Sequence, residues 1–251
     1  MATATEAAAP MTDVRDRIIV ALDVDSAGEA ADIVSELHGR VGAFKVGLQL
    51  FAAAGPEFVR ELTRAENKVF LDLKFHDIPN TVAKASVEAI RLGVWMFNMH
   101  CAGGGEMMLT AVKEVDAVCA SEGLSRPIVI GVTVLTSSNL ETMREIGIGS
   151  DVETQVARLA RLAAESGLDG VVASPLEVAA VRDAVTDPKF LTVTPGIRGK
   201  SATADDQRRV TTIGRALTGG SDYVVIGRPI TQASDRLAAL EAIVNEAKAG
   251  N

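Results

Sequence analysis

The chain has 251 residues, of which 47% are hydrophobic and 23% are charged. A hydrophobic fraction of this size is typical of a globular protein and excludes disordered and fibrous classes. The 33 acidic and 25 basic residues give a net charge of −8, which argues against nucleic acid or an anionic membrane as the main partner. The charge still allows a small anionic ligand that is held by a few local cations.

Two cysteines, Cys101 and Cys119, are too few for a disulfide framework and lack the CxxC spacing of zinc sites. We expect both to be buried, reduced thiols. No apolar run approaches the roughly 20 residues of a membrane helix, and the first residues carry no signal-peptide pattern. We therefore expect a cytoplasmic protein with a disordered N-terminal tail over residues 1–13 and one folded domain over residues 14–251.

From Arg15 onward, short runs rich in β-branched residues alternate with longer amphipathic segments. The runs predict strands at Ile18–Leu22, Phe44–Gly47, Val69–Leu73, Met96–Met99, Ile128–Val134, Gly170–Ala173, Leu191–Thr194 and Tyr223–Ile226. The segments between them predict helices that include Ala27–His38, Thr81–Leu92, Glu106–Glu122, Val152–Ser166, Glu177–Val185 and Asp235–Lys248.

Strands that are apolar on both faces and joined by helices indicate a parallel sheet with helical cover. The repetition of this unit favours a single-domain (β/α)8 barrel over a doubly wound sheet. The dinucleotide-binding fingerprint is also absent, because the first strand leads into Asp23-Val24-Asp25 and not into a glycine-rich turn.

In a barrel of this kind, chemistry belongs at the carboxyl ends of the strands. Polar and charged residues gather at those positions, which is unusual because a charge beside an apolar strand is costly unless it is paired. They are Asp23, Lys45, Asp72 with Lys74, His100, Thr136, Ser174, Arg198, and Gly227 with Arg228.

The third strand ends in the densest group of charges. Asp72 and Lys74 stand two positions apart, so on a strand both project toward the barrel axis while Leu71 and Leu73 face the helices. A lysine between Asp72 and Asp77 keeps its proton, because opposite charges favour its charged form, and this suits a proton donor. Lys45 would extend these charges into an alternating array of Lys45, Asp72, Lys74 and Asp77. The alternative is an ion-pair network that only fixes the geometry of the strands.

The loops after the seventh and eighth strands form the usual phosphate site of this barrel. Here they carry glycines, whose N–H groups can approach an anion, and arginines, which add a bidentate fork. These residues are Gly196, Arg198, Gly199, Gly227 and Arg228. The polar segment Gly196–Gln207 is long enough to act as a lid over a phosphate.

Several other polar side chains are expected to be structural. His76 and His100 have no spacing that supports a metal site, and a histidine at a strand end is usually hydrogen-bonded within the fold. Gln49, Asn98 and Ser174 receive the same structural interpretation. We therefore expect no metal ligands in this chain.

The segment Asp72-Leu-Lys-Phe-His-Asp-Ile-Pro-Asn-Thr81 resembles the signature of the orotidine 5′-phosphate decarboxylase family. The resemblance extends along nearly the whole chain in the family's order. It includes Ala21-Leu22-Asp23, Phe44-Lys45-Val-Gly-Leu, Val134-Leu-Thr136-Ser, Thr194-Pro-Gly-Ile-Arg198, Gln207 and Ile226-Gly227-Arg228-Pro.

The resemblance implies decarboxylation of orotidine 5′-monophosphate to uridine 5′-monophosphate, the last step of de novo UMP biosynthesis, without a cofactor. Lys74 would protonate C6, Asp72 would face the substrate carboxylate, and Asp77 would act from the neighbouring subunit of a homodimer. The substrate-binding residues it implies are Asp23, Lys45 and Thr81 at the ribose, Thr136 at the pyrimidine, and Arg198, Gln207, Gly227 and Arg228 at the phosphate.

Two alternatives stay open. One is a related sugar-phosphate decarboxylase, such as one acting on a keto-gulonate phosphate, whose resemblance would imply an acidic residue on the second strand and a magnesium ion. Lys45 in that place argues against it. The other is a non-catalytic phosphate-binding barrel, which has no need of a lysine between two carboxylates.

Overall fold

The computed structural model describes residues 13–197 and 211–249. Within them, eight parallel strands close into a barrel in chain order, since β8 pairs with β1 as well as with β7. The strands are β1 (Ile18–Ala21), β2 (Ala43–Gly47), β3 (Val69–Phe75), β4 (Met96–His100), β5 (Ile128–Val132), β6 (Gly170–Val172), β7 (Leu191–Thr194) and β8 (Tyr223–Ile226). The predicted single-domain (β/α)8 barrel is confirmed.

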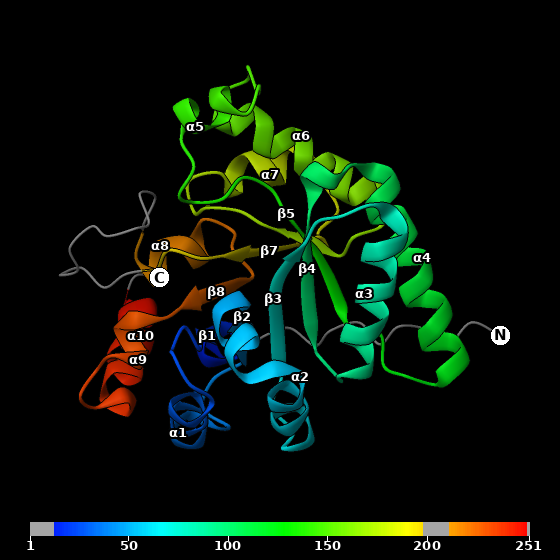
Figure 1. Cartoon of the computed structure of the whole chain (residues 1–251). Coiled ribbons are helices and arrows are strands. Elements are labelled where there is room, and N and C mark those ends of the chain that lie inside the picture. Colours follow the sequence, from blue (N-terminus) through cyan, green and yellow to red (C-terminus); the bar gives the residue numbers. More distant parts are fainter. Residues whose placement is uncertain (1–12, 198–210, 250–251) are drawn as a thin grey trace.

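Helices lie outside the ring of strands, as Figure 1 shows. The α-helices are α1 (Ala27–Leu37), α2 (Leu48–Arg64), α3 (Pro79–Arg91), α4 (Gly105–Glu122), α5 (Leu140–Glu145), α6 (Val152–Glu165), α7 (Val178–Ala184), α8 (Ile213–Thr218), α9 (Arg228–Thr231) and α10 (Arg236–Ala249). Two short 3-10 helices are η1 (Val14–Arg17) and η2 (Cys101–Gly103).

The strands are buried on both faces, which explains their continuous apolar runs. One face contributes to the interior of the barrel, where side chains from the different strands meet. This interior cluster contains Ile19, Ala21, Ala43, Phe70, Met96, Ile130, Val193 and Val225. The other face packs against the helices in a larger cluster that includes Leu71 and Phe97. Because side chains alternate along a strand, the interior cluster fixes which later residues point toward the barrel axis.

Two strand ends differ from the sequence prediction by two residues, and the other strand bounds agree with it to within one residue. β5 ends at Val132 and not at Val134. The last ladder hydrogen bond to β6 runs from the Thr133 N–H to the carbonyl of Val172 at 3.3 Å, and the Thr133 hydroxyl donates to the same oxygen at 2.8 Å. The chain then leaves the sheet toward α5. β3 instead continues beyond Leu73 to Phe75.

The helices named in the sequence analysis do not include α2, α5, α8 or α9. α2 is amphipathic, but Gly55, with a φ of 72°, kinks it immediately before Pro56. The other three helices have only four to six residues, so they offer too few turns for a periodic signal.

The pairing of β3 with β4 is irregular at the point where the charged residues begin. Leu71 pairs with Phe97, but the next partners are Phe75 and Met99, so β3 uses four steps where β4 uses two. Within this bulge Lys74 adopts a φ of 53°, a left-handed conformation that is uncommon for a residue with a side chain. The simple alternation expected for β3 therefore fails at Lys74.

Features outside the barrel also bear on the sequence predictions. Of the predicted tail, only Asp13 is among the described residues, and its carboxylate accepts a hydrogen bond from the Arg15 N–H at 3.0 Å. Cys101 and Cys119 are free and buried, as expected. No helix within residues 13–197 and 211–249 is long and apolar enough to cross a membrane.

Candidate active site

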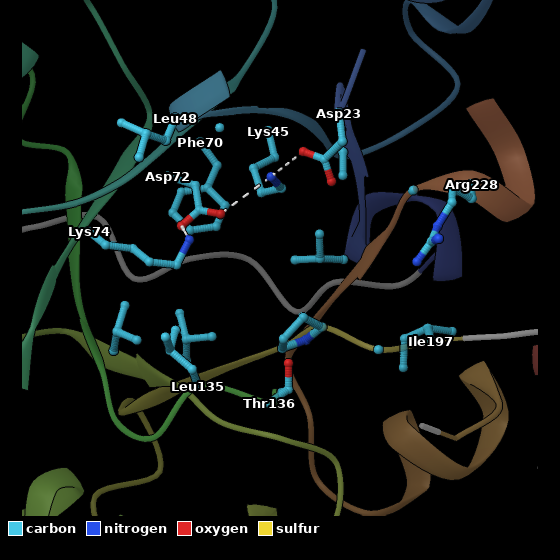
Figure 2. A pocket seen from close by; sticks show the side chains of 18 of the residues that line it. Asp23, Lys45, Leu48, Phe70, Asp72, Lys74, Leu135, Thr136, Ile197 and Arg228 are labelled. Carbon is cyan, nitrogen blue, oxygen red and sulfur yellow. Dashed lines mark hydrogen bonds and ion pairs between the residues drawn. The ribbon is translucent and has the colours of Figure 1, made fainter. Parts of the chain in front are cut away.

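A cavity of about 510 Å³ opens at the carboxyl ends of the strands (Figure 2). Its walls come from strand ends and the loops that follow them, so residues distant in sequence meet there. The predicted site residues that line it are Asp23, Lys45, Asp72, Lys74, Thr136, Gly227 and Arg228. Most of the described residues that the sequence analysis selected at strand ends are thus brought together in one place.

Four of these side chains form a continuous chain of ion pairs. Lys45 Nζ lies 2.8 Å from Asp23 Oδ1 and 3.3 Å from Asp72 Oδ2. The other oxygen of Asp72, Oδ1, lies 2.7 Å from Lys74 Nζ. The dashed lines in Figure 2 follow this order, from Asp23 through Lys45 and Asp72 to Lys74. The predicted alternation is present from Lys45 through Asp72 to Lys74, and Asp23 extends it beyond Lys45.

The centre of the array is buried. Lys45 is 8% exposed and Asp72 is 9% exposed. Burial disfavours the charge on Asp72, but the ammonium groups of Lys45 and Lys74 outweigh it and hold the pKa of the Asp72 carboxyl below its usual value. Burial also disfavours the charge on Lys45, and the carboxylates of Asp72 and Asp23 outweigh it and raise the pKa of Lys45. Both groups therefore stay charged at neutral pH.

The lack of a side chain at Gly47 leaves room for the Lys45 ammonium. A Cβ at Gly47 would lie 3.0 Å from Lys45 Nζ and 3.3 Å from Asp23 Oδ1. That is closer than a side chain normally approaches another group, so a larger residue at position 47 would displace the ion pair. The Phe44-Lys45-Val-Gly segment thus supplies both the cation and the room for it.

The wall opposite the charged array has a different character. Figure 2 places Arg228 across the cavity from Asp72 and Lys74. Thr136 and Gly227 also line the cavity, and a Cβ at Gly227 would lie 3.8 Å from Asp23 Oδ2. Arg198 and Gln207, the other residues predicted for the phosphate, and most of the predicted lid lie outside the described residues. The cavity therefore joins a buried ion-pair network on one side to an arginine on the other.

Asp77 and Thr81 do not line the cavity of this chain. Both are exposed, and Asp77 Oδ1 accepts a hydrogen bond from the N–H of Ile78 at 2.6 Å. The sequence analysis groups the four charges Lys45, Asp72, Lys74 and Asp77. A single protomer brings together the first three.

The two histidines near the array lie beside each other, with ring centroids 5.4 Å apart. Burial, the neighbouring His76 and the Lys74 ammonium together lower the pKa of His100, so this ring is neutral at pH 7. Within the described ranges, no group of three or more His, Cys, Asp or Glu side chains is arranged to hold a metal ion.

One residue that the sequence analysis treated as structural contacts the array directly. Asn98, on β4, is fully buried and donates from Nδ2 to Asp72 Oδ1 at 2.7 Å. The available sequence signal was a polar side chain two positions after Met96, on the face of β4 that points into the barrel.

The fold and the cavity define a barrel protein with a charged site at the carboxyl ends of its strands, the arrangement of a TIM-barrel enzyme. Residues 16–243 match the model of the Orotidine 5'-phosphate decarboxylase / HUMPS family. The chain belongs to this family.

Individual relatives agree with the family match. The chain is 50% identical over 236 residues to the Orotidine 5'-phosphate decarboxylase of Syntrophotalea carbinolica, covering 94% of this chain and 96% of that protein. It is 51% identical over 236 residues to that of Geobacter sulfurreducens, covering 94% and 98%. Among solved structures, the Orotidine 5'-phosphate decarboxylase of Lactobacillus acidophilus superposes with a TM-score of 0.80 at 40% identity, covering 92% of this chain and 98% of that one.

Proposed function

We propose that this protein decarboxylates orotidine 5′-monophosphate to uridine 5′-monophosphate and carbon dioxide without a cofactor, as the last step of de novo UMP biosynthesis. The observation that carries the proposal is the buried chain of ion pairs through Lys45, Asp72 and Lys74 at the edge of a cavity. It stands in a chain that shares about half its residues with proteins named for this activity.

The array suits this reaction electrostatically. When the bond between C6 of the pyrimidine and its carboxylate breaks, carbon dioxide leaves and the electron pair stays on C6. A fixed cation beside C6 stabilises that charge in a site that excludes water, and the same group can supply the proton. We assign both roles to the Lys74 ammonium, whose Nζ is held 2.7 Å from Asp72 Oδ1. The proton passes from Nζ to C6, which leaves UMP.

Asp72 and its neighbours have supporting roles in this proposal. Asp72 faces the substrate carboxylate and keeps Lys74 oriented, and its charge persists because its pKa is held low. Lys45 and Asp23, which lie 2.8 Å apart, hold hydroxyls of the ribose. Thr136 lies against the pyrimidine.

The opposite wall binds the phosphate. Arg228 and Gly227 line the cavity, and we assign Arg198 and Gln207 to the same subsite from their places in the sequence. An arginine forms paired hydrogen bonds with phosphate oxygens, and a glycine lets the backbone approach an anion. Because the phosphate does not react, its binding energy is available to close the site around the pyrimidine.

We further propose a homodimer in which Asp77 and Thr81 enter the site of the partner subunit. Both residues are exposed in a single protomer, and Ile78, between them, exposes 66% of its apolar side chain. Other large apolar side chains are exposed on loops and helices that follow the strand ends, including Leu48 and Leu176. Burial of this apolar surface against a second copy would complete the charge array.

We also propose that this biosynthetic enzyme acts in the cytoplasm. Two free, buried cysteines agree with a reducing compartment. The sugar-phosphate decarboxylase alternative is less favoured, because the charged residue on β2 is Lys45 and a lysine does not ligate magnesium.

The proposal is tested by following the absorbance of orotidine 5′-monophosphate with and without a chelator, for the parent and for Lys74→Ala. The parent should turn over the substrate at the same rate in both conditions. A positioned proton donor usually contributes about 10²–10⁴-fold to the rate, and the lost cation adds to this effect. We therefore expect kcat of Lys74→Ala to fall by at least about 10²-fold while the variant still binds UMP. A parent that binds UMP but does not turn over, or a variant within about tenfold of the parent, would contradict the proposal.

A further inference from the structure

Asn98 is a polar residue in the interior of the barrel, where most side chains are apolar. It is fully buried on β4, two residues after Met96, which belongs to the apolar interior cluster. Since side chains alternate along a strand, Asn98 points the same way as Met96, one layer nearer the cavity. A buried amide that lacks partners is costly, so the partners of Asn98 determine what it does.

Both ends of the Asn98 amide are used, and both contact the charged array. Nδ2 donates to Asp72 Oδ1 at 2.7 Å, and Oδ1 accepts from the backbone N–H of Lys74 at 2.8 Å. The two partners differ chemically, since a carboxylate at neutral pH only accepts and a backbone N–H only donates. The orientation of the amide is therefore fixed, and no apolar residue of the same size can replace it.

The contact with Lys74 lies at the irregularity between β3 and β4. The ladder partners jump from Leu71 with Phe97 to Phe75 with Met99, so the segment from Asp72 to Lys74 bulges out of the regular pairing. The side-chain oxygen of Asn98 takes the place of the backbone acceptor that the Lys74 N–H would otherwise find across a regular ladder. It thereby holds Lys74 at its φ of 53°, a conformation that persists only where its surroundings impose it.

We propose that Asn98 is a positioning residue that fixes the relative placement of Asp72 and Lys74 through its two hydrogen bonds; this inference rests on the function proposed above. One hydrogen bond orients the carboxylate and the other holds the backbone from which the Lys74 side chain reaches into the cavity. Asp72 Oδ1 receives both Lys74 Nζ and Asn98 Nδ2, so the amide and the ammonium converge on one oxygen. The amide hydrogen bond also contributes to the lowered pKa of Asp72.

The first test compares Asn98→Ala with the parent. We expect kcat for orotidine 5′-monophosphate to fall by about 10²-fold, the effect of misplacing a reacting group by about 1 Å, while Kd for UMP changes less than about threefold. UMP binding should persist because Arg228 lies across the cavity and because Asn98 bonds to Asp72 and Lys74, not to the proposed ribose residues Lys45 and Asp23. A kcat within about threefold of the parent would overturn the inference.

Thr194→Val is the matched control. Thr194 is also fully buried on a barrel strand, and its hydroxyl lies 2.7 Å from Ser221 Oγ, remote from the charged array. Loss of this hydrogen bond should lower thermal stability and leave kcat within about twofold of the parent. An equal fall of kcat in both variants would show that any buried hydrogen bond in the barrel matters equally, which would overturn a positioning role.

A double-mutant cycle separates action through Lys74 from a general loss of structure. If Asn98 acts by placing Lys74 and Asp72, Asn98→Ala should cost less than about threefold in a chain that already carries Lys74→Ala. The same loss in both backgrounds would contradict the inference. If Asn98→Ala does not fold, Asn98→Asp replaces it, because a protonated carboxyl can still accept from the Lys74 N–H and donate to Asp72. Its kcat relative to the parent should fall as pH rises and that carboxyl ionises; a ratio that does not change with pH would contradict the inference.

A crystal structure of Asn98→Ala tests the inference without any substrate. We expect Lys74 to leave its left-handed conformation, or Lys74 Nζ to move from Asp72 Oδ1 by more than about 1 Å. An unchanged array would overturn the inference even if the parent proved inactive toward orotidine 5′-monophosphate. An inactive parent with a displaced array would instead contradict the proposed function and support the positioning role of Asn98.

Discussion

Lys45 and Asp72 are charged residues that lie almost fully buried on strands of the barrel. Removing either charge from water is costly, and each is stabilised only because it has more than one partner of opposite charge. Lys45 has Asp23 and Asp72, and Asp72 has Lys45, Lys74 and the amide of Asn98. Buried ion pairs of this kind provide a fixed electrostatic field that can act on a bound molecule.

The residue proposed for the phosphate can be tested with a truncated substrate. Arg228→Ala should raise KM for orotidine 5′-monophosphate by at least about tenfold, because a charge-assisted contact is lost. It should leave the much slower reaction of orotidine, which lacks the phosphate, nearly unchanged. Steady-state kinetics with both substrates check this.

The control for this prediction is Arg64→Ala. Arg64 lies on α2 with its side chain 69% exposed and pairs with Glu57. Its removal should change neither substrate's kinetics. If Arg228→Ala impaired both substrates equally, Arg228 would belong to the chemistry or to the fold and not to phosphate binding.

The neutral state of His100 predicts a dependence of stability on pH. Burial lowers the pKa of His100 in the folded state, whereas in the unfolded chain it lies near 6.5. Between these values the unfolded chain binds more protons, so stability falls as pH decreases from about 6.5 through the folded pKa. Urea unfolding at pH 7.5 and 5.5 should show a smaller loss for His100→Gln than for the parent. An equal loss in both proteins would refute this account.

Among the elements, β3 and β5 show how packing sets strand ends. Val134 extends the pattern of β-branched residues past Val132, yet β5 stops at Val132, the last residue that pairs with β6. The reverse happens on β3, where charged residues continue the strand because β2 and β4 hold partners for them. Hydrophobicity marks where strands lie, but partners decide where they stop.

The close contact between Gly170 on β6 and Leu191 on β7 predicts how adding a methyl group at position 170 changes stability. A Cβ at Gly170 would lie 2.3 Å from the backbone carbonyl oxygen of Leu191, and the backbone cannot move without disturbing the ladder. Gly170→Ala should therefore lower the free energy of unfolding by about 1–3 kcal/mol or more. Urea denaturation of the purified variant measures this.

Gly28→Ala is the control for the same substitution. Gly28 lies in the first turn of α1, and a Cβ there would meet no atom within 4 Å. Because alanine favours a helix over glycine, this variant should be unchanged or more stable by up to about 1 kcal/mol. Comparable destabilisation of both variants would show that the contact with Leu191 is not the cause.

At the scale of the whole molecule, the question is whether one chain makes a complete site. One protomer gathers Lys45, Asp72 and Lys74, but Asp77 is exposed beyond the end of β3. Mixing Lys74→Ala chains with Asp77→Ala chains tests the proposed sharing. In a mixed two-fold dimer one site would carry both lesions and the other neither, so up to about a quarter of all sites should regain parental activity.

If Asp77 acted within its own chain, every site would keep one lesion and mixing would restore nothing. Mixing the Lys74→Ala protein with itself is the control, and sedimentation of the parent establishes that the dimer exists. A parent that stays monomeric at assay concentrations would contradict the proposed sharing.

The amino-acid sequence by itself determined the architecture and most of the site. Alternating β-branched runs and amphipathic segments are enough to predict a (β/α)8 barrel. The period and length of the hydrophobic pattern reflect which side chains of each strand or helix are buried. The charges at Asp23, Lys45, Asp72 and Lys74 were identifiable because topology alone brings the carboxyl ends of parallel strands together. The tertiary structure decided what local pattern cannot encode. The bulge that sets Lys74 in a left-handed conformation depends on Asn98, a residue on another strand whose role is invisible until β3 and β4 pair.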